Sequence, residues 1–257
     1  MEIKSEDIES ALLEQADEEQ RKVLCRFFKT GKGEYGEGDK FIGLKVPITR
    51  QVVKLAKRQV ELDEIEKLLL SQWHEVRLAG LLLLVEEMKA AIPKKRDTPL
   101  SGAERRKELT DFFLAHARQA NNWDLVDLSC GYILGTALLF PGPDGRMPDR
   151  SILDRLAVSD NLWEQRISIV STLTLIRANQ FDDTLRIAGK LISHRHDLIH
   201  KAVGWMLREV GKRDKPLLED FLEKHYNRMS RTTLRYAIER FPEHERQQWL
   251  KRPASKA

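Results

Sequence analysis

Four stretches of the chain resemble one another and recur at regular intervals, which constrains the fold more than any other feature. Each combines a polar lead-in, a basic residue and an apolar helical pattern: HEVRLAGLLLL (74–84), WEQRISIVSTL (163–173), IHKAVGWMLRE (199–209) and TTLRYAIERF (232–241). WDLVDLSCGYIL fits between the first two, so the spacing is about 35–45 residues, as in paired-helix solenoids. Such units bury their apolar faces only by stacking on neighbours. The sequence therefore predicts an all-α helical-repeat solenoid, an α-α superhelix.

The basic residues of these stretches are expected to line up along one concave face of the solenoid. They are Arg77, Arg166, Lys201 and Arg235. Such a column suits a phosphate backbone; the alternative is that each residue caps or ion-pairs with a neighbouring helix. We expect one domain over 1–257, with a frayed tail at 251–257 and a basic loop at about 93–107 that either contacts phosphates or is solvated.

The charge and apolar content of the chain limit its partners only loosely. The net charge of +4 and sequence pI near 9.0 permit an anionic partner such as nucleic acid without establishing one. No apolar run reaches the ~18 residues of a membrane span, and the polar start MEIKSEDIES is unlike a signal peptide. Cys25 and Cys130 lie far apart in apolar helical contexts, which favours buried thiols in a reducing compartment. We expect a cytoplasmic protein with no membrane partner.

The N-terminal part of the chain contains a candidate anion site. Glu6–Phe28 shows a helical apolar pattern, and Thr30–Asp39 (TGKGEYGEGD) follows as a turn, because its GxGxxG lacks the preceding strand of a dinucleotide site. Pro47 is typical of the first turn of a new helix. Lys45 and Arg50 flank that helix start, where free amides and positive side chains suit an anion; the alternative is that they are solvated charges.

Two histidines have the spacing of metal ligands. His196 and His200 in HDLIH are placed like the pair in the zinc motif HExxH. Asp replaces the Glu of that motif, and no downstream ligand is evident. The chain also contains no P-loop, no GxSxG and no Cys–His zinc spacing. We therefore expect no metal site.

Asp127 is the single charged residue between Leu125 and Phe140. A carboxylate in such an apolar run is costly to bury unless something pairs with it. No Lys or Arg lies three or four residues away, so the helix itself supplies no cation. Trp123 precedes the acid by four residues, which places an indole and a lone carboxylate on one helical face, one turn apart.

Trp163, Arg166 and Trp205 join this pair through the repeat alignment. In one interpretation the tryptophans pack in the core and Arg166 pairs with Asp127. In the other, these side chains line a cleft for a cationic, sugar-bearing group beside a phosphate. Indole faces attract cations, arginine clamps phosphate, and a carboxylate near an anomeric carbon stabilises an oxocarbenium-like transition state.

The chain resembles the AlkD family of DNA glycosylases, alkylation repair enzymes built from HEAT-like repeats. The resemblance runs from about Phe27 to Phe241. It rests on FIGLKVPITR (41–50), NNWDLVD (121–127), NLWEQRISIVSTL (161–173), HKAVGWMLREVGKRD (200–214) and RTTLRYAIERF (231–241). It implies a curved HEAT-like solenoid that hydrolyses the N-glycosidic bond of cationic N3- or N7-alkylpurines in duplex DNA. It also implies that no cofactor is needed, since an already cationic base leaves readily.

The resemblance assigns roles to particular residues. Asp127 would be the catalytic aspartate, Trp123 and Trp205 would contact the deoxyribose of the lesion, and Arg166 would contact the phosphate backbone. We add Lys201, Arg235, Lys45 and Arg50 as candidate DNA contacts. We expect a monomer whose partner is double-stranded DNA containing alkylated purines, and which is nucleoid-associated when on DNA.

One departure from the family's sequence pattern stays open, and so do two functions other than a glycosylase. Phe27 stands where members of the family carry a tyrosine, and Tyr35 is the candidate substitute for that hydroxyl. Relatives can keep such a scaffold without the activity. The alternatives are therefore a non-catalytic HEAT-repeat module that binds distorted or branched DNA, and a solenoid whose basic column binds an acidic protein.

Overall fold

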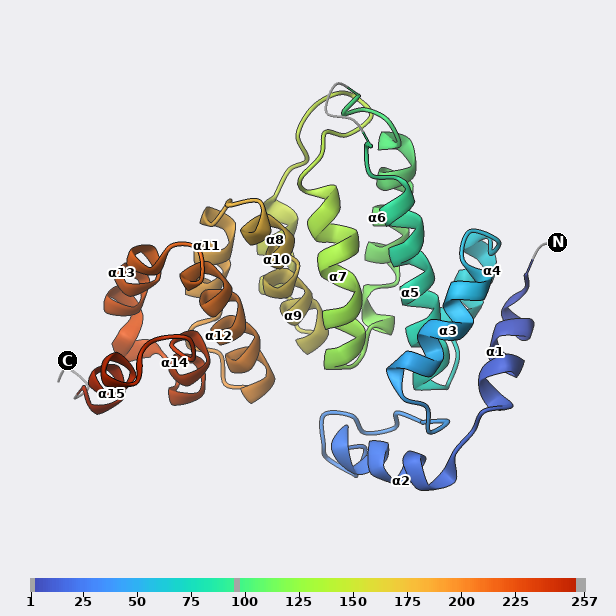
Figure 1. The fold of residues 1–257 in the computed structure, drawn as a ribbon, viewed down its shortest axis with the longest axis horizontal. Coiled ribbons are helices and arrows are strands. Elements are labelled where there is room, and N and C mark those ends of the chain that lie inside the picture. The colour runs from blue at the N-terminus through green and yellow to red at the C-terminus, as the bar shows by residue number, and fades with distance from the viewer. Residues whose placement is uncertain (1–2, 95–97, 253–257) are drawn as a thin grey trace. The chain divides into compact units, whose positions relative to one another are not determined.

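The computed structural model describes residues 3–94 and 98–252, and every regular element in these ranges is a helix (Figure 1). The predicted all-α fold is confirmed. The one β-type feature among the described residues is an isolated bridge between Lys40 and Trp73. The chain divides into two compact units, 1–146 and 147–257, each with its own core, and the single domain over 1–257 stays a prediction. Within the described ranges no helix is long and apolar enough to cross a bilayer.

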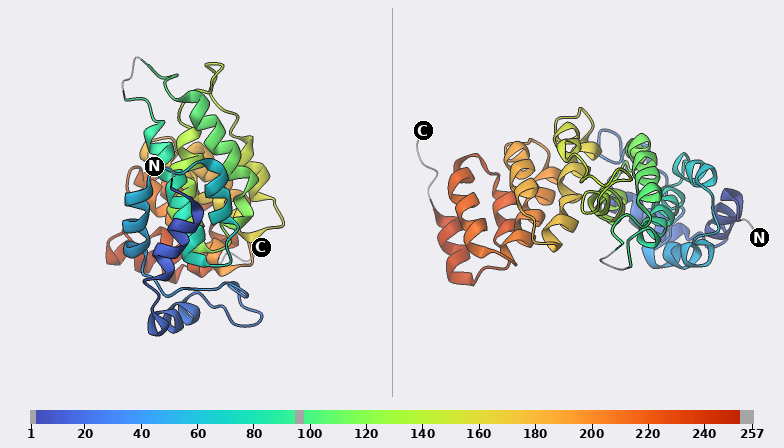
Figure 2. Two further views of the ribbon diagram at one scale, coloured as in Figure 1. Left: turned by 90° about the vertical axis from the view of Figure 1, so that its right-hand side faces the viewer. Right: turned by 90° about the horizontal axis from the view of Figure 1, so that it is seen from above.

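The first unit is organised around one long buried helix, α5 (His74–Ala90). The helices that pack on it are α1, α3, α4, α6 and α7 (Figures 1 and 2). The other elements of the unit are α1 (Ser5–Leu13), α2 (Glu18–Phe27), α3 (Val46–Ala56), α4 (Leu62–Leu69), α6 (Ala103–Ala115), the short 3-10 helix η1 (Ala117–Gln119) and α7 (Trp123–Ala137). Because α5 is surrounded, the polar residues of its first turn are buried and need internal partners.

The N-terminal pattern is two helices rather than the single helix predicted over 6–28. The chain leaves the helix after Leu13, and the Asp17 side chain accepts a hydrogen bond from the Gln20 amide (2.9 Å), which starts α2. The glycine-rich segment that follows is a series of turns, as predicted. Pro47 lies in the first turn of α3, also as predicted.

The predicted basic loop at 93–107 is shorter than expected, because α6 already begins at Ala103. Gly102 permits that start: it has φ +71°, and a Cβ there would lie 2.4 Å from the Ala91 carbonyl oxygen. Arg106, expected in the loop, is 2% exposed and donates to four backbone carbonyls, those of Ala91, Pro99, Ser101 and Pro141. It therefore holds backbone in place instead of contacting phosphate. Residues 95–97 of the predicted loop lie outside the described residues.

The second unit packs most closely between α12 and α14, which lie side by side in Figures 1 and 2. Gly204 makes this possible, because a Cβ there would lie 2.4 Å from Tyr236 Cβ and 2.7 Å from the Thr233 carbonyl oxygen. The elements are α8 (Ser151–Ala157), α9 (Leu162–Val170), α10 (Thr172–Arg177), α11 (Asp182–Leu191), α12 (Asp197–Gly211), α13 (Lys215–His225), η2 (Tyr226–Arg228), α14 (Arg231–Ala237) and α15 (Glu243–Lys251). Of the predicted tail, Lys251 is the last residue of α15, and 253–257 lie outside the described residues.

Candidate functional site

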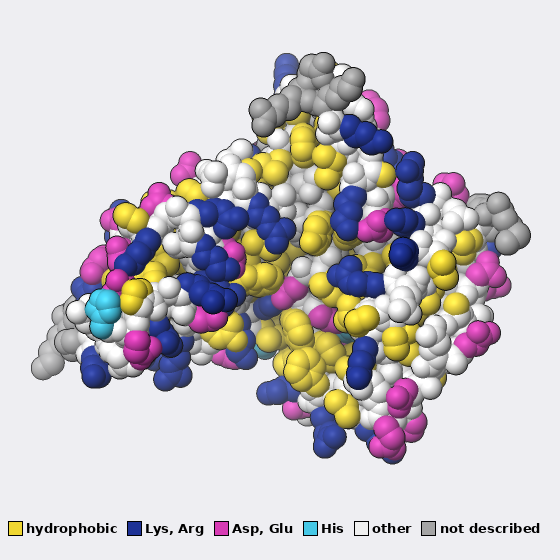
Figure 3. Space-filling view, in the orientation of Figure 1, with side chains coloured by type: hydrophobic (Ala, Val, Ile, Leu, Met, Phe, Trp, Pro, Cys, Tyr) yellow, Lys and Arg dark blue, Asp and Glu magenta, His cyan; other side chains and the backbone are white. Residues whose placement is uncertain are grey.

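A pocket of about 460 Å³ in the first unit has Asp127 and Trp123 in its wall. Both come from the start of α7, one turn apart as the sequence predicts. Lys45 lines the same pocket. Figure 3 shows hydrophobic side chains gathered on this face, where α2 ends and α7 begins. The structure thus brings three of the predicted site residues together around one apolar cavity, the usual form of a binding site.

Aromatic rings form one wall of this pocket. The ring of Trp123 stacks on Phe28, with centroids 5.3 Å apart and planes at 19°. Phe27 meets the same indole edge-on at 5.9 Å and is 61% exposed. Tyr35, the candidate substitute for a family tyrosine, directs its hydroxyl to the Phe27 carbonyl (3.4 Å). This wall therefore presents flat apolar rings to the pocket. Because residue 27 is phenylalanine, it contributes no hydroxyl.

A buried group of charges borders the same pocket, and His74 and Asp124 are among the residues that line it. His74 Nδ1 lies 2.8 Å from Asp39 Oδ2, and His74 Nε2 lies 2.9 Å from Asp124 Oδ2. Arg77 pairs with the other oxygen of Asp39 at 2.5 Å and donates to the Ser71 carbonyl (2.9 Å). Asn122, the N-cap of α7, donates to Asp39 Oδ2 (3.0 Å) and accepts from the Trp123 amide (2.9 Å). Two carboxylates therefore face two cations in a water-poor setting.

These contacts set the charge state of His74. Burial disfavours the imidazolium, but the Asp124 and Asp39 carboxylates outweigh burial and raise the pKa of His74 to about 9. For Asp39, burial opposes ionisation, yet the hydrogen bond and charge of His74, together with Arg77, hold the pKa of the carboxyl below its usual range. His74 is therefore charged at neutral pH and donates from both ring nitrogens.

Glu75 holds the backbone that floors the pocket. Its carboxylate is buried and accepts from the amides of Ile42 (2.9 Å), Gly43 (2.9 Å) and Leu44 (3.0 Å). Gly43 has φ +103°, and a Cβ there would lie 2.0 Å from the Asp17 carbonyl oxygen, so only glycine fits. The requirement for glycine at position 43 and the amide contacts to Glu75 account for the FIGL segment (41–44). Lys45 follows this segment and directly precedes α3.

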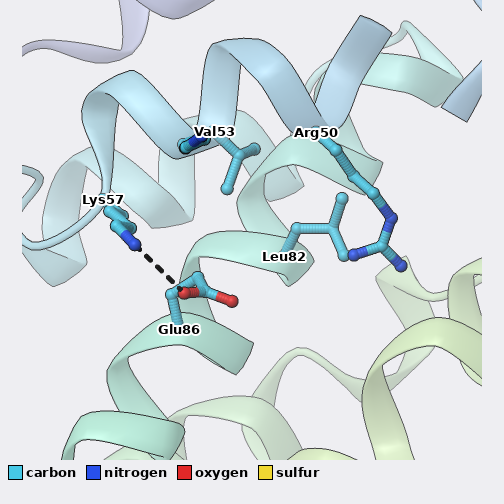
Figure 4. A pocket seen from close by; sticks show the side chains of 6 residues that line it. Arg50, Val53, Lys57, Leu82 and Glu86 are labelled. Carbon is cyan, nitrogen blue, oxygen red and sulfur yellow. Dashed lines mark ion pairs between the residues drawn. The ribbon is translucent and has the colours of Figure 1, made fainter. Parts of the chain in front are cut away.

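The two basic residues flanking the start of α3 face different surroundings. Lys45 is exposed at the rim of the Asp127 pocket. Arg50 lines a second, small pocket of about 110 Å³ between α3 and α5 (Figure 4). There Lys57 pairs with Glu86 at 3.9 Å, and the Arg50 guanidinium lies beside Leu82. Among the described residues Lys45 and Arg50 have no ion pair, and both are accessible to an anion.

The predicted column of basic residues divides into buried and accessible members. Arg77 and Arg166 are 5% and 4% exposed, and Arg166 donates to the Leu198 carbonyl. For Arg77 the interpretation as a phosphate contact is wrong, because its guanidinium is buried against Asp39. Lys201 is half-buried and pairs with Asp197 at 2.8 Å, while Arg235 is exposed. A phosphate contact by Arg166 stays a prediction, and it requires the side chain to reach out from a buried position.

The remaining predicted residues belong to the second unit. Trp163 is buried, which fits core packing, and Trp205 is half-buried on α12 next to Gly204. His196 Nδ1 accepts from the Leu198 amide (3.2 Å) at the start of α12, and His200 Nε2 contacts the His194 carbonyl. The described residues include no group of three or more His, Cys, Asp or Glu side chains placed to hold a metal ion. Within HDLIH, His196 is the N-cap of α12.

The sequence did not reveal the buried charges that border the pocket. Asp39, His74 and Asp124 lie 35 and 50 residues apart along the chain, so no local spacing connects them. The available signal was three polar residues, His74, Glu75 and Arg77, at the start of a helix whose next eight residues, 78–85, are all apolar or glycine. Buried polar side chains at such a place need partners.

Comparison with known proteins places the chain in one family. The family model described as "DNA alkylation repair enzyme" matches residues 8–241. Among solved structures, the chain is similar to one titled "Predicted DNA alkylation repair enzyme from Enterococcus faecalis", with 16% identity and a TM-score of 0.62 over 89% of this chain and 97% of that chain. At that identity the likeness shows the fold. No curated protein matches the chain.

Proposed function

Because the chain belongs to the DNA alkylation repair enzyme family, we propose that it is a DNA glycosylase for cationic N3- and N7-alkylpurines in duplex DNA. The observation that carries this proposal is the aromatic pocket with Asp127 and Trp123 in its wall and Lys45 beside them. An indole face attracts a cation, and a carboxylate one turn away suits positive charge that develops on a sugar.

The reaction follows from the charge of the substrate. The bond between C1′ and the purine nitrogen breaks, and its electron pair leaves with the base, which becomes neutral. Asp127 stabilises the positive charge that moves to the sugar and orients the water whose oxygen bonds to C1′. The water gives up a proton to solvent or to the carboxylate. The base leaves without being protonated, so the single carboxylate of Asp127 is sufficient and no metal or cofactor is required.

The direct test is release of bases from duplex DNA treated with a methylating agent, with unmodified duplex as the matched substrate control. We expect free 3-methyladenine or 7-methylguanine, detected by chromatography, and an abasic site that breaks under alkali. DNA binding without any release would overturn the glycosylase and favour the module that binds distorted DNA. Neither binding nor release would overturn both and favour a protein partner.

We expect Arg50→Gln to weaken DNA binding and to lower the salt dependence. Each phosphate contact contributes about 0.9 to the slope of log K against log salt, so one lost contact should reduce the slope by about that amount. Arg50 is exposed, so the substitution should leave the fold intact. Titrations at several salt concentrations measure the slope, with Arg177→Gln, another exposed arginine, as the matched control. An unchanged slope for Arg50→Gln would show that this residue does not contact phosphate.

A further inference from the structure

Two routes of hydrogen bonds converge on the first turn of α7. In one, His74 on α5 contacts Asp124, the residue after Trp123 (2.9 Å). In the other, Asp39 accepts from Asn122, whose side chain caps the Trp123 amide (3.0 and 2.9 Å). His74 also contacts Asp39 (2.8 Å), which joins the two routes. The turn that carries Trp123, and one turn later Asp127, is therefore attached to α5 by His74 through Asp124, and by His74 and Arg77 through Asp39 and Asn122.

We propose that His74 is a positioning residue for the alkylpurine site: clamped between the Asp39 and Asp124 carboxylates, it fixes the first turn of α7 and so the placement of Trp123 and Asp127. This inference rests on the proposed function, because it assigns His74 a role in that same reaction. His74 reaches the reacting groups through Asp124 and through the α7 backbone.

The rings around His74 support this role. The imidazole stacks on Phe41 with centroids 4.3 Å apart and lies 5.1 Å from Phe28. Phe28 in turn stacks on Trp123 at 5.3 Å. A shift of His74 would therefore reach Trp123 through packed rings as well as through hydrogen bonds. Closely packed groups transmit such displacements because no empty space absorbs them.

The clamp is complete only while His74 carries its second proton. Each ring nitrogen faces a carboxylate, which only accepts, so a neutral ring leaves one contact without a hydrogen. The charged groups around His74 are Asp39 from the loop, Arg77 and Glu75 from α5, and Asp124 from α7. Asp127 and Lys45 line the same pocket as His74.

The pH dependence follows from the same contacts. The pKa of His74 is raised from 6.5 to about 9, so its contribution is complete below pH 6.5 and is lost as pH rises through about 9. Asp39, whose pKa is lowered, stays ionised over that range. Above about pH 9 the ring keeps one N–H, so the turn retains the Asn122 route and only one of the two His74 hydrogen bonds. We therefore expect base release to fall with an alkaline limb near that pH.

Two variants separate the routes. In His74→Gln the side-chain amide nitrogen takes the place of Nε2 and can still donate to Asp124. In His74→Asn it takes the place of Nδ1 and can donate to Asp39 only. Both variants are neutral and remove the same charge, so they form a matched pair, and thermal unfolding defines a temperature at which each is folded.

We expect His74→Asn to lower kcat for base release by about 10²-fold with little change in KM, since small displacements of a reacting group have effects of that order. His74→Gln should stay within about fivefold of wild type, and the alkaline limb should be absent from both variants. Equal losses in the two variants, or an alkaline limb that persists in both, would overturn the proposal.

A spectroscopic reading keeps this inference separate from the proposed function. The indole N–H resonance of Trp123, assigned with Trp123→Phe, should shift with a midpoint near pH 9 in wild type and stay constant with pH in both variants. If wild type released no base but this shift occurred, the glycosylase would be overturned and the clamp retained. A resonance without that shift would overturn the clamp whatever the activity.

Discussion

Asp127→Asn is expected to release alkylated purines on the order of 10²–10³-fold more slowly than wild type, which corresponds to about 3–4 kcal/mol of transition-state stabilisation. The reason is electrostatic, since the sugar becomes positive only as the base departs and asparagine offers no negative charge. The substitution preserves the shape of a half-buried side chain, so the pocket should keep its form. Single-turnover release from methylated duplex measures the effect without interference from product dissociation.

The matched control for Asp127→Asn is Asp63→Asn, the same chemical change at an exposed position of α4. It should release bases as fast as wild type. Binding of undamaged duplex should be equal in all three proteins, because the loss concerns the transition state. Equal release by wild type and Asp127→Asn would remove Asp127 from the reaction and leave its carboxylate as a structural group.

Glu75→Ala is expected to destabilise the first unit by about 3–5 kcal/mol, the largest effect we foresee on stability. The substitution leaves the buried amides of Ile42, Gly43 and Leu44 without their acceptor, and each buried donor without a partner costs about 1–3 kcal/mol. Glu75→Gln should cost less, about 2–3 kcal/mol, because one oxygen remains as an acceptor. Urea unfolding measures the total, and hydrogen exchange at these three amides gives the local effect.

Glu86→Gln is the control for Glu75, because it makes the same change on the same helix at a more exposed position that forms surface ion pairs with Lys57 and Lys89. Such pairs are worth about 0–1 kcal/mol. A cost below about 1 kcal/mol for Glu75→Ala, with slow exchange retained at Ile42–Leu44, would show that other groups hold this segment.

Features that depend on neighbouring residues were predictable from the sequence. The apolar repeats predicted helices, Pro47 predicted the start of α3, and the four-residue interval placed Trp123 and Asp127 on one face. That face proved to border a pocket. In each case the deciding contacts lie within one or two helical turns, where spacing determines position.

Features that depend on distant residues were not predictable. Arg77 and Arg106 look like solvated or phosphate-binding charges in the sequence, yet each is buried by partners from other parts of the chain. The partners of Glu75 are backbone amides, and no side-chain pattern reveals those. The break between α1 and α2 depended on capping by Asp17, a residue that the apolar periodicity does not register.

The four carbonyl contacts of Arg106 also have a consequence for altering the protein. Three of them hold the two ends of the connection from α5 to α6, at Ala91 on one side and at Pro99 and Ser101 on the other. The number of residues between these fixed ends then has little effect on the stability of the helices, since doubling the length of a loop costs only about 0.6 kcal/mol. The segment between Ile92 and Pro99 is thus a natural place to insert a peptide tag or a fluorescent reporter.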